Sequence, residues 1–453
     1  MPTIKLRPIL RPACHALLAL AGSGALAQGA ANAVPGQTPA LPAPVAAVPN
    51  DSAARDEAVL SLADLVSLVQ RHNPNLRAAL QGREAARAAV VTAAALPNPE
   101  IEAGSGQARA RLPSAVGGNL SSWEVMQRLE NPSVRSARIE GAQFGLEGSR
   151  QQVAATANDL VAQVRLKAYE WLLRGEEAEA AGEALQLLEQ IRDRVRARVQ
   201  SGEAPRLESI KADAEVVNAR QRFEAARLQV DQAALAVNQL VAGQLPPRWR
   251  LSASLSDAPG LPSTEQLQYE AHDRNPELAQ LRAEVARREA LLREARASRF
   301  PGVDLRYGES REREFRQGVF SVGVRLPLLD QGRGRIDEAA AELTRARTLL
   351  VGRRTELSLQ IQSATKALEV ARLRVDALAR GAVPEAEAAL RVAQAAYRFG
   401  ERGILDVLDA QRLLRTVRAD LIDARFRLQA AAVELEFLAG RYAVNDTAAS
   451  ARP

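Results

Sequence analysis

The chain of 453 residues carries 60 basic and 54 acidic side chains, so its formal net charge is only +6. A basic excess this small, interleaved with acids, is typical of a solvated helix surface and argues against nucleic acid as a partner. Only 4% of the residues are aromatic and the apolar ones are mostly Ala, Leu and Val, which predicts thin helix-on-helix packing rather than one thick core.

The first 27 residues are organised like a secretory signal peptide. A basic opening and an apolar middle are followed by the small-x-small motif that ends at Ala27, so we predict cleavage before Gln28. The only cysteine, Cys14, would leave with this segment, and we expect no disulfide or thiolate metal ligand in the mature chain. No later segment approaches eighteen consecutive apolar residues, which argues against a transmembrane helix.

An internal repeat organises most of the remaining chain. "RHNPNLRAAL" at 71–80 resembles "DRNPELAQLR" at 273–282, with the two prolines 202 residues apart. "SGEAPRLESIKAD" at 201–213 resembles "FGERGILDVLDAQ" at 399–411, with the leading glycines 198 apart. Matches in the same order at a nearly constant separation predict two copies of one unit.

These observations predict five segments. They are a signal peptide over 1–27, a flexible linker over 28–58, a first structural repeat over 59–250, a second over 251–440 and a disordered tail over 441–453.

Each repeat has the same order of predicted elements. A helix stops near a proline, two short extended segments follow, a very long helix comes next, and a shorter helix returns with the alternating steps of four and three that mark a coiled-coil seam. The expected helices cover about 75–96, 133–200 and 205–240 in the first repeat, and 276–299, 332–398 and 403–440 in the second.

The extended segments predict two β-hairpins, about 98–130 and 301–328. In an alignment that pairs Trp123 with Phe320, the second strand of each hairpin has one mainly apolar face and one mainly polar face. This alternation is typical of a membrane β-strand. Solvent-exposed hairpins on a soluble protein are the alternative. Four strands cannot close a barrel, and an open edge cannot lie in lipid, so membrane strands would have to be pooled by several chains; three chains would supply twelve.

The sequence resembles the TolC-type outer membrane efflux proteins over about residues 60–440. The resemblance rests on the tandem repeat, the Asn-Pro that starts each unit, "VGVRLPLLDQGRGRIDEA" at 322–339 and above all "AYRFGERGILDVLDAQ" at 396–411. It implies a mainly α fold with a small β part, in which long helical hairpins build a periplasmic α-barrel and four strands per chain join a twelve-stranded trimeric β-barrel. "RLENPSVRSARIEGA" at 128–142 is closer to the branch that serves resistance-nodulation-division pumps, including CzcC-like metal exporters.

The function implied by this resemblance is that of an exit duct in a tripartite efflux system. The chain would form a homotrimer in the lipid of the outer membrane of a Gram-negative bacterium and extend into the periplasm. There it would receive small molecules or metal cations from an inner-membrane pump, of the resistance-nodulation-division type, through a periplasmic adaptor (a membrane fusion protein). Two alternatives remain open: a soluble periplasmic coiled-coil adaptor or scaffold, and an outer membrane duct for type I protein secretion.

The resemblance also assigns roles to residues at the periplasmic tip. Gly202, Gly400 and Gly403 would form the tip turns. Asp406 and Asp409 are three residues apart on one helix face, and threefold symmetry would make them two stacked carboxylate rings that favour cations. Without the resemblance, the two aspartates are better read as ordinary acids at a helix start, where the helix dipole favours them.

A lock on the closed tip is the last role that the resemblance implies. Tyr397 and Arg402 would bond to the neighbouring hairpin, with Glu208 as their acidic partner, and Arg425 matches a further basic residue on the return helix. Leu207 stands where the family can carry a hydroxyl, so we expect one lock hydrogen bond to be missing.

No enzyme function is predicted. His72 and His272, the two histidines of the mature chain, occupy matching places beside the Asn-Pro motifs and are read as polar residues at a helix start. The sequence has no G-x-S-x-G, no metal-spaced cluster and no phosphate loop, so no catalytic, cofactor or metal site is assigned.

Overall fold

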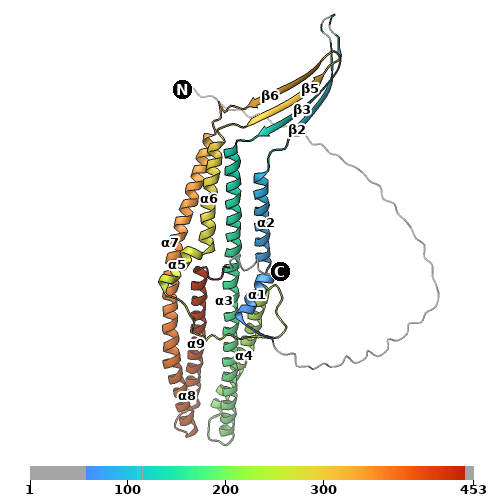
Figure 1. Cartoon of the computed structure of the whole chain (residues 1–453). Helices are drawn as coiled ribbons and strands as arrows, with labels where there is room; N and C mark the ends of the chain where they lie inside the picture. The colour runs from blue at the N-terminus through green and yellow to red at the C-terminus, as the bar shows by residue number, and fades with distance from the viewer. Residues whose placement is uncertain (1–57, 110, 112, 115, 444–453) are drawn as a thin grey trace, which may run out of the picture. The chain divides into compact units, whose positions relative to one another are not determined.

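The computed structural model describes residues 58–109, 111, 113–114 and 116–443 (Figure 1). The predicted signal peptide and all but the last residue of the predicted linker lie outside them. The elements in chain order are β1 (Ala58–Leu60), α1 (Leu62–His72), α2 (Pro74–Ala94), β2 (Glu100–Ala108), β3 (Gly118–Leu129), α3 (Pro132–Gln200), α4 (Arg206–Leu240), β4 (Trp249–Leu251), α5 (Thr264–Arg274), α6 (Pro276–Ala297), β5 (Val303–Arg311), β6 (Arg316–Val324), α7 (Arg333–Ala377), the π-helical turn η1 (Leu378–Ala382), α8 (Val383–Arg398) and α9 (Ile404–Leu438).

The expected helices and strands are present, and their ends differ from the predicted ones by four residues at most. Four short elements were not predicted. Helices α1 and α5 precede the two Asn-Pro motifs, and α1 begins with a capping box in which Ser61 and Asp64 bond each other's backbone N–H. Strands β1 and β4 pair in parallel and join the start of the first repeat to the segment after α4.

The Asn-Pro motif that opens each repeat is a helix start. Asn73 and Asn275 are the N-caps of α2 and α6, and each side-chain oxygen accepts hydrogen bonds from two backbone N–H groups of the following turn. The proline takes the first helical position, where its missing N–H costs nothing. Asn131 caps α3 in the same way before Pro132, so asparagine followed by proline begins three of the helices.

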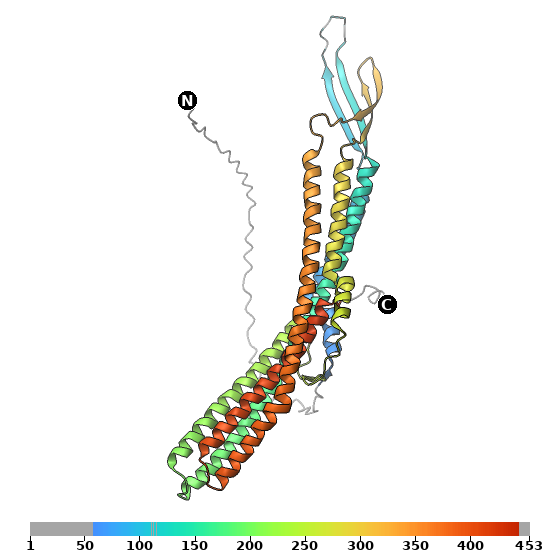
Figure 2. The ribbon, with the colours of Figure 1, turned by 90° about the vertical axis from the view of Figure 1, so that its left-hand side faces the viewer.

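The helices form a layer in which α3 is central. It packs against α2 and α4 on one side and against α6 and α9 on the other, while α7 packs against α6 and α9 (Figure 1). Figure 2 shows α7 (orange), α6 (yellow) and α3 (teal) side by side. The return helix α4 therefore continues the direction of α2, and α9 continues that of α6, beside the two long helices. The apolar residues are distributed over several buried clusters along this layer, as the composition predicted.

The second long helix, which consists of α7, η1 and α8, has one residue more than α3 between positions that match in the two repeats. The pair Arg138-Ile139 in α3 matches Arg335-Ile336 in α7 at a separation of 197, whereas Gly202 and Gly400 are 198 apart. A π turn takes in one extra residue without rotating the helix on either side of it. The turn Leu378–Ala382 supplies that place, and the N–H of Val383 bonds the carbonyl of Leu378 five residues back.

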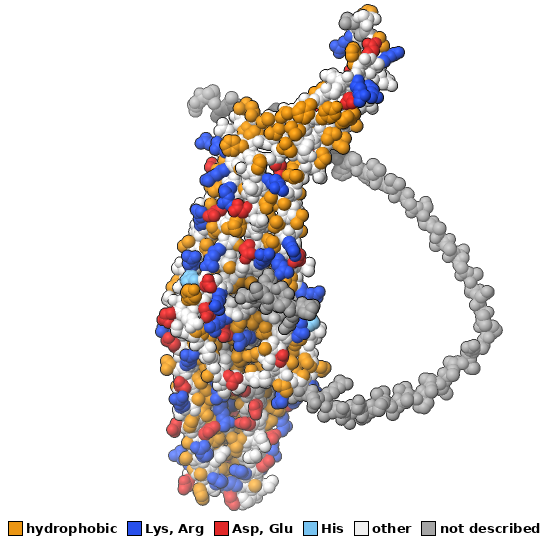
Figure 3. Space-filling model, viewed as in Figure 1, with side chains coloured by type: hydrophobic (Ala, Val, Ile, Leu, Met, Phe, Trp, Pro, Cys, Tyr) orange, Lys and Arg blue, Asp and Glu red, His pale blue; other side chains and the backbone are white. Residues whose placement is uncertain are grey.

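The four longer strands form an antiparallel sheet in the order β2-β3-β5-β6. Val125 lies opposite Tyr307, and Tyr307 lies opposite Phe320, so the predicted faces of β3 and β6 are the same face of one sheet. Hydrophobic side chains gather over the part of the sheet nearer the helices, and charged ones lie near its far end (Figure 3). The apolar face carries Ile101, Trp123, Val125, Leu129, Val303, Leu305, Tyr307, Phe320, Val322 and Val324.

The opposite face of the sheet is polar. Arg128 pairs with Asp304 across β3 and β5 at 2.9 Å, and Arg306 lies 4.0 Å from Glu124 on the same face. This two-sided pattern confirms the alternation expected from the sequence.

No helix in the part of the chain that the structure describes has the length and hydropathy of a membrane span.

The end of the ordered chain differs from the prediction. The disordered tail was predicted to begin at 441, but Arg441 pairs with Glu270 at 2.7 Å, and the N–H of Tyr442 donates to the side-chain oxygen of Asn158 at 3.1 Å. These contacts hold residues 441–443 against α5 and α3. The later residues of the predicted tail lie outside the described residues.

Candidate functional site: the tip of the helical hairpins

The two hairpin turns at the tip have the same backbone conformation. Gly202 and Gly400 have φ angles of 81° and 75°, in the left-handed region that favours glycine. In each turn the next residue bonds back to a carbonyl five positions earlier: the N–H of Glu203 to Arg198 at 2.9 Å and that of Glu401 to Ala396 at 3.0 Å. Both long helices therefore end in a Schellman motif.

Gly403 has a different place from the other two predicted turn glycines. It is the N-cap residue of α9, with φ −80° and ψ 167°, an extended conformation that any residue adopts. Its counterpart in the first repeat is Pro205, the N-cap of α4. Glycine is therefore not required there by the backbone.

Asp406 and Asp409 lie on one face at the start of α9, as their spacing predicted. Their side chains are 44% and 68% exposed, so both carboxylates are open to solvent. Arg402 lies 3.7 Å from Asp406, and Arg412 lies 3.1 Å from Asp409. Arg412 also contacts Glu215 on α4, so its positive charge is shared between one carboxylate on each hairpin.

The structure brings Tyr397 and Glu208 together. The hydroxyl of Tyr397, in the last turn of α8, donates to a carboxylate oxygen of Glu208, in the first turn of α4, at 3.3 Å. Tyr397 is only 8% exposed. Burial, and then the neighbouring Glu208 carboxylate, raise the pKa of this hydroxyl above its ordinary value.

The bond of Arg402 to Glu208 of a neighbouring hairpin stays a prediction, and within the single chain Arg402 has another partner. The ion pair of Arg402 is with Asp406, four residues along the same chain segment, and its side chain is 66% exposed. Arg402 precedes α9 by two residues, so Asp406 in the first turn of that helix is within easy reach of its guanidinium. Arg425 is far along α9 from these residues and lies 3.9 Å from Glu176 on α3.

Arg198 is the tip residue that the sequence did not reveal. Its guanidinium lies over the ring of Tyr397, 4.7 Å from the centroid, and donates to the Tyr397 carbonyl oxygen at 3.1 Å. It also lies 3.6 Å from Glu203 in the turn. A basic residue in the last turn of a helix is ordinary, so no local pattern pointed to a contact with α8.

The two hairpins of one chain share a buried core below these contacts. The core comes from α3, α4, α8 and α9 and consists of Leu188, Ile191, Val195, Ala212, Val216, Ala219, Ala386, Leu390, Tyr397, Ile404, Val407, Leu408 and Leu414. Arg418 on α9 reaches across it to Glu183 on α3 at 2.9 Å and to Glu387 on α8 at 2.8 Å.

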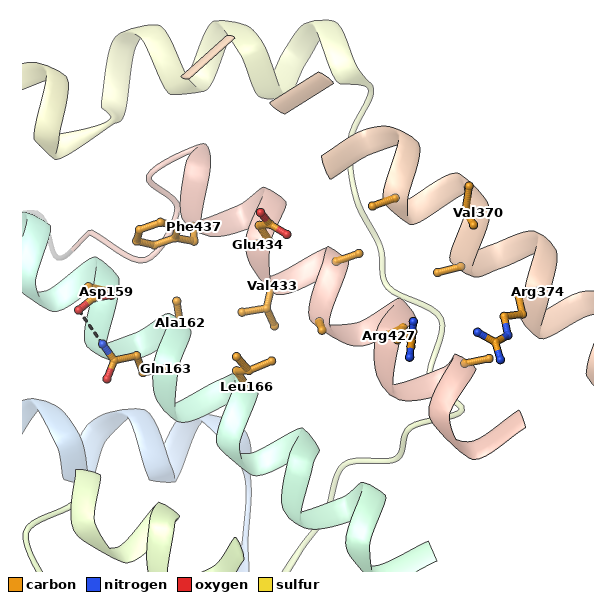
Figure 4. Close-up of a pocket in the computed structure, with 15 residues that line it drawn as sticks. Asp159, Ala162, Gln163, Leu166, Val370, Arg374, Arg427, Val433, Glu434 and Phe437 are labelled. Carbon is orange, nitrogen blue, oxygen red and sulfur yellow. Dashed lines mark hydrogen bonds between the residues drawn. The ribbon is translucent and has the colours of Figure 1, made fainter. Parts of the chain in front are cut away.

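A groove of about 620 Å³ lies farther along α9, between α3 and α7 (Figure 4). Val433 and Phe437 of α9 and Leu166 of α3 form part of its apolar wall, and Asp159 accepts a hydrogen bond from Gln163 at its edge. Glu434 of α9 also lines the groove and lies four heptads after Asp406 on the same helix. Among the described residues no group of His, Cys, Asp and Glu is placed to hold a metal ion.

Comparison with known proteins agrees with this architecture. The sequence profile of the family described as "Outer membrane efflux protein" matches residues 65–243 and 267–441, which are the two repeats. The cobalt-zinc-cadmium resistance protein CzcC of Cupriavidus metallidurans is 26% identical over 384 residues, which is 84% of this chain and 90% of that protein.

Solved structures show the same fold. The transmembrane channel CusC superposes with a TM-score of 0.73 at 18% identity, over 83% of this chain and 91% of that one. The open state of the outer membrane channel MtrE of Neisseria gonorrhoeae superposes with a TM-score of 0.72 at 19% identity, over 84% and 88%. The family resemblance seen in the sequence is thereby confirmed. The chain belongs to the outer membrane efflux protein family, whose members are trimeric, non-enzymatic channels of tripartite efflux systems that lie in the outer membrane and extend into the periplasm.

Proposed function

We propose that this channel exports cations, with divalent metal ions as its cargo, and that Asp406 and Asp409 line its narrowest point. The observation that carries the proposal is a pair of exposed carboxylates on one face of α9, next to the turn that ends the hairpin. In a trimer they become two rings of three, and rings of carboxylates favour cations in a pore. The similarity to a cobalt-zinc-cadmium resistance protein supports the same cargo class.

The chain's own residues define what the rings can do. Asp406 and Asp409 each have an arginine within 4 Å, but both arginines are largely exposed, so solvent screens these pairs. Arg412 is shared with Glu215. The two carboxylates therefore remain accessible to a passing cation. In this proposal they act as a charge filter, and among the described residues no group of His, Cys, Asp and Glu is placed to hold a metal ion.

A periplasmic adaptor and an inner-membrane pump complete the proposed system. The two turns Gly202 and Gly400 end on exposed side chains, Leu207 and Phe399 among them, which offer apolar contacts to an adaptor. We assign the pump to the resistance-nodulation-division type. Cross-linking in cells, followed by detergent purification of the trimer, should recover both partners. Recovery of the trimer with neither of them would contradict this part of the proposal.

Selectivity in planar bilayers tests the charge filter. Replacement of both aspartates by asparagine, which keeps their shape, should move the reversal potential in a salt gradient toward zero and abolish block by a trivalent cation added from the periplasmic side. The matched control is the pair Asp420→Asn and Asp423→Asn, which has the same spacing on α9 but contacts Arg374. Equal selectivity loss in both double variants would refute a filter at Asp406 and Asp409.

Growth tests the cargo. Loss of this chain from its host should lower tolerance to divalent metal ions, and the parent sequence should restore it. If metal tolerance is unchanged and tolerance to uncharged organic toxicants falls instead, the cargo assignment is wrong although the duct remains.

A further inference from the structure

We propose that Arg198 is a gating residue of this channel and that it joins the two hairpins of one chain beside Tyr397. The inference rests on the proposed role of the tip as the gate. It adds to the predicted lock a basic side chain from the first long helix, α3.

Arg198 joins the two hairpins through two contacts with one residue. Its Nη1 donates to the backbone oxygen of Tyr397 at 3.1 Å, and its guanidinium plane lies 4.7 Å from the centre of the Tyr397 ring. Tyr397 lies on α8 and Arg198 on α3, so both contacts break when the α8–α9 hairpin separates from the α3–α4 hairpin. Arg198 can act only while the two hairpins are together.

The contacts have favourable electrostatics. The Tyr397 oxygen is one of the last carbonyls of α8, at the negative end of the helix dipole, and it already accepts from Gly400 at 3.1 Å. A guanidinium stabilises such a terminus, and stacking over an aromatic ring adds a cation–π attraction. The Arg198 side chain is about 29% exposed, less than half the 66% of Arg402. Solvent therefore screens the contacts of Arg198 less.

Tyr397 is held from both sides. Its hydroxyl donates to Glu208 while its ring and its carbonyl contact Arg198. Arg198 of α3, Glu208 of α4 and Tyr397 of α8 thus form one cluster. Glu203 in the turn after α3 lies 3.6 Å from the Arg198 guanidinium. These contacts hold the two hairpins of one chain together at the tip.

The test is single-channel conductance of the purified trimer in planar bilayers. Arg198→Gln should raise the open fraction about tenfold at neutral pH, because a charge-assisted hydrogen bond and a cation–π contact are lost together. Arg198→Lys keeps the charge and the apolar stem but loses the planar donor, and should give an intermediate increase.

The matched control is Arg194→Gln. Arg194 lies one turn earlier on α3, is exposed, and has no hydrogen bond or ion pair in the described part of the chain. It removes the same charge from the same helix. An open fraction in Arg198→Gln equal to that of the parent, or an equal increase in Arg194→Gln, would overturn the proposal.

Two readouts keep this inference separate from the proposed function. The reversal potential reports the aspartate filter and should be the same in Arg198→Gln and in the parent, whereas the open fraction reports the lock. If Arg198→Gln does not yield trimers, Arg198→Lys carries the test, and a parent-like open fraction in that variant overturns the inference. If no variant conducts at all, the proposed function fails first.

Discussion

The side-chain amide of Asn275 donates a hydrogen bond of 3.0 Å to the carbonyl oxygen of Leu438, the last residue of α9. The same asparagine caps α6 with its oxygen. The buried Asn275 therefore caps the start of α6 and also donates a hydrogen bond to a carbonyl at the end of α9, the helix that continues α6 along the layer. Asn73 makes the equivalent bond to Leu240 at 2.9 Å, so the joint occurs once in each repeat.

This joint can be separated into its two parts by substitution. Asn275→Ser keeps a capping oxygen but cannot reach Leu438, whereas Asn275→Ala loses both. We expect serine to cost about 1 kcal/mol and alanine about 2–3 kcal/mol of stability, because a buried carbonyl loses its donor in both and the cap is lost only in alanine. The temperature at which the trimer dissociates on a gel measures the difference. Equal losses for the two variants would mean that the cap contributes nothing.

Tyr397 predicts an alkaline change in gating. Burial and the Glu208 carboxylate raise its pKa, so the folded, closed tip favours the neutral hydroxyl. The stability from this group is complete below the ordinary tyrosine pKa of about 10 and decreases as the pH rises above it. We expect the open fraction of the parent to be constant up to about pH 10 and to rise above it.

Tyr397→Phe is the control for that titration. It cannot ionise, so its open fraction should be slightly higher at neutral pH, from the loss of a bond of about 1 kcal/mol, and should then stay constant as the pH rises. An alkaline increase as large as that of the parent would assign the titration to another group.

The π turn predicts that one residue can be removed from the second long helix. Gly381 is exposed, and a side-chain carbon placed on it would meet nothing within 4 Å. Its deletion should close the turn into a continuous α-helix without rotating either flank. Pro384 complicates the outcome, because a proline inside a continuous helix clashes with the carbonyl four residues back and costs about 3 kcal/mol.

Two variants and a control test this reading of the π turn. Deletion of Gly381 alone should lower the trimer dissociation temperature, and deletion combined with Pro384→Ala should restore it. Deletion of Gly175 from α3 is the control; its surroundings are equally open, but α3 has no π turn, so every later side chain would rotate by about 100°. We expect no trimer from that variant. A restored trimer there would mean that the helices tolerate slips in general.

Glu270 and Arg441 predict a loss of stability in acid. The Arg441 guanidinium, at 2.7 Å, lowers the pKa of the Glu270 carboxyl below its ordinary value. The stability from this pair is complete above the unfolded pKa, near 4.5, and is lost as the pH falls through the lower folded value. Glu270→Gln should cost about 2 kcal/mol at pH 7. The difference from the parent should shrink toward pH 3 in thermal unfolding, and a constant difference would exclude ionisation as the cause.

The sequence predicted those parts of the fold that repeat. The Asn-Pro motifs, the glycines of the turns and the alternation in the strands each occur twice, so a second copy supported every assignment. Helix α1 was also within reach, because Ser61 and Asp64 spell a capping box. The β1–β4 pair was not, since three-residue strands far apart in the chain leave no pattern.

Residue spacing alone made the site predictable only within one helix, and the contact of Tyr397 on α8 with Glu208 on α4 was expected only from the family resemblance. The common face of Asp406 and Asp409 follows from their spacing. Whether Arg402 or Arg198 approaches Tyr397 depends on the packing of α3 against α8, which no spacing in the sequence contains. The extra residue of the second long helix was readable, because the separation of matched residues changes from 197 to 198, but its position in the helix was not.

The sheet has a consequence for assembly. Strands β2 and β6 are its two edges, and within the described chain each pairs with a neighbour on one side only. A row of unpaired backbone groups next to an apolar face is a surface that adheres to other chains. Two associated subunits would still expose one β2 edge and one β6 edge, and only a third subunit pairs both of them. Partial assemblies should therefore be short-lived, and a single chain that crosses the periplasm should need a chaperone that covers both the sheet edge and its apolar face.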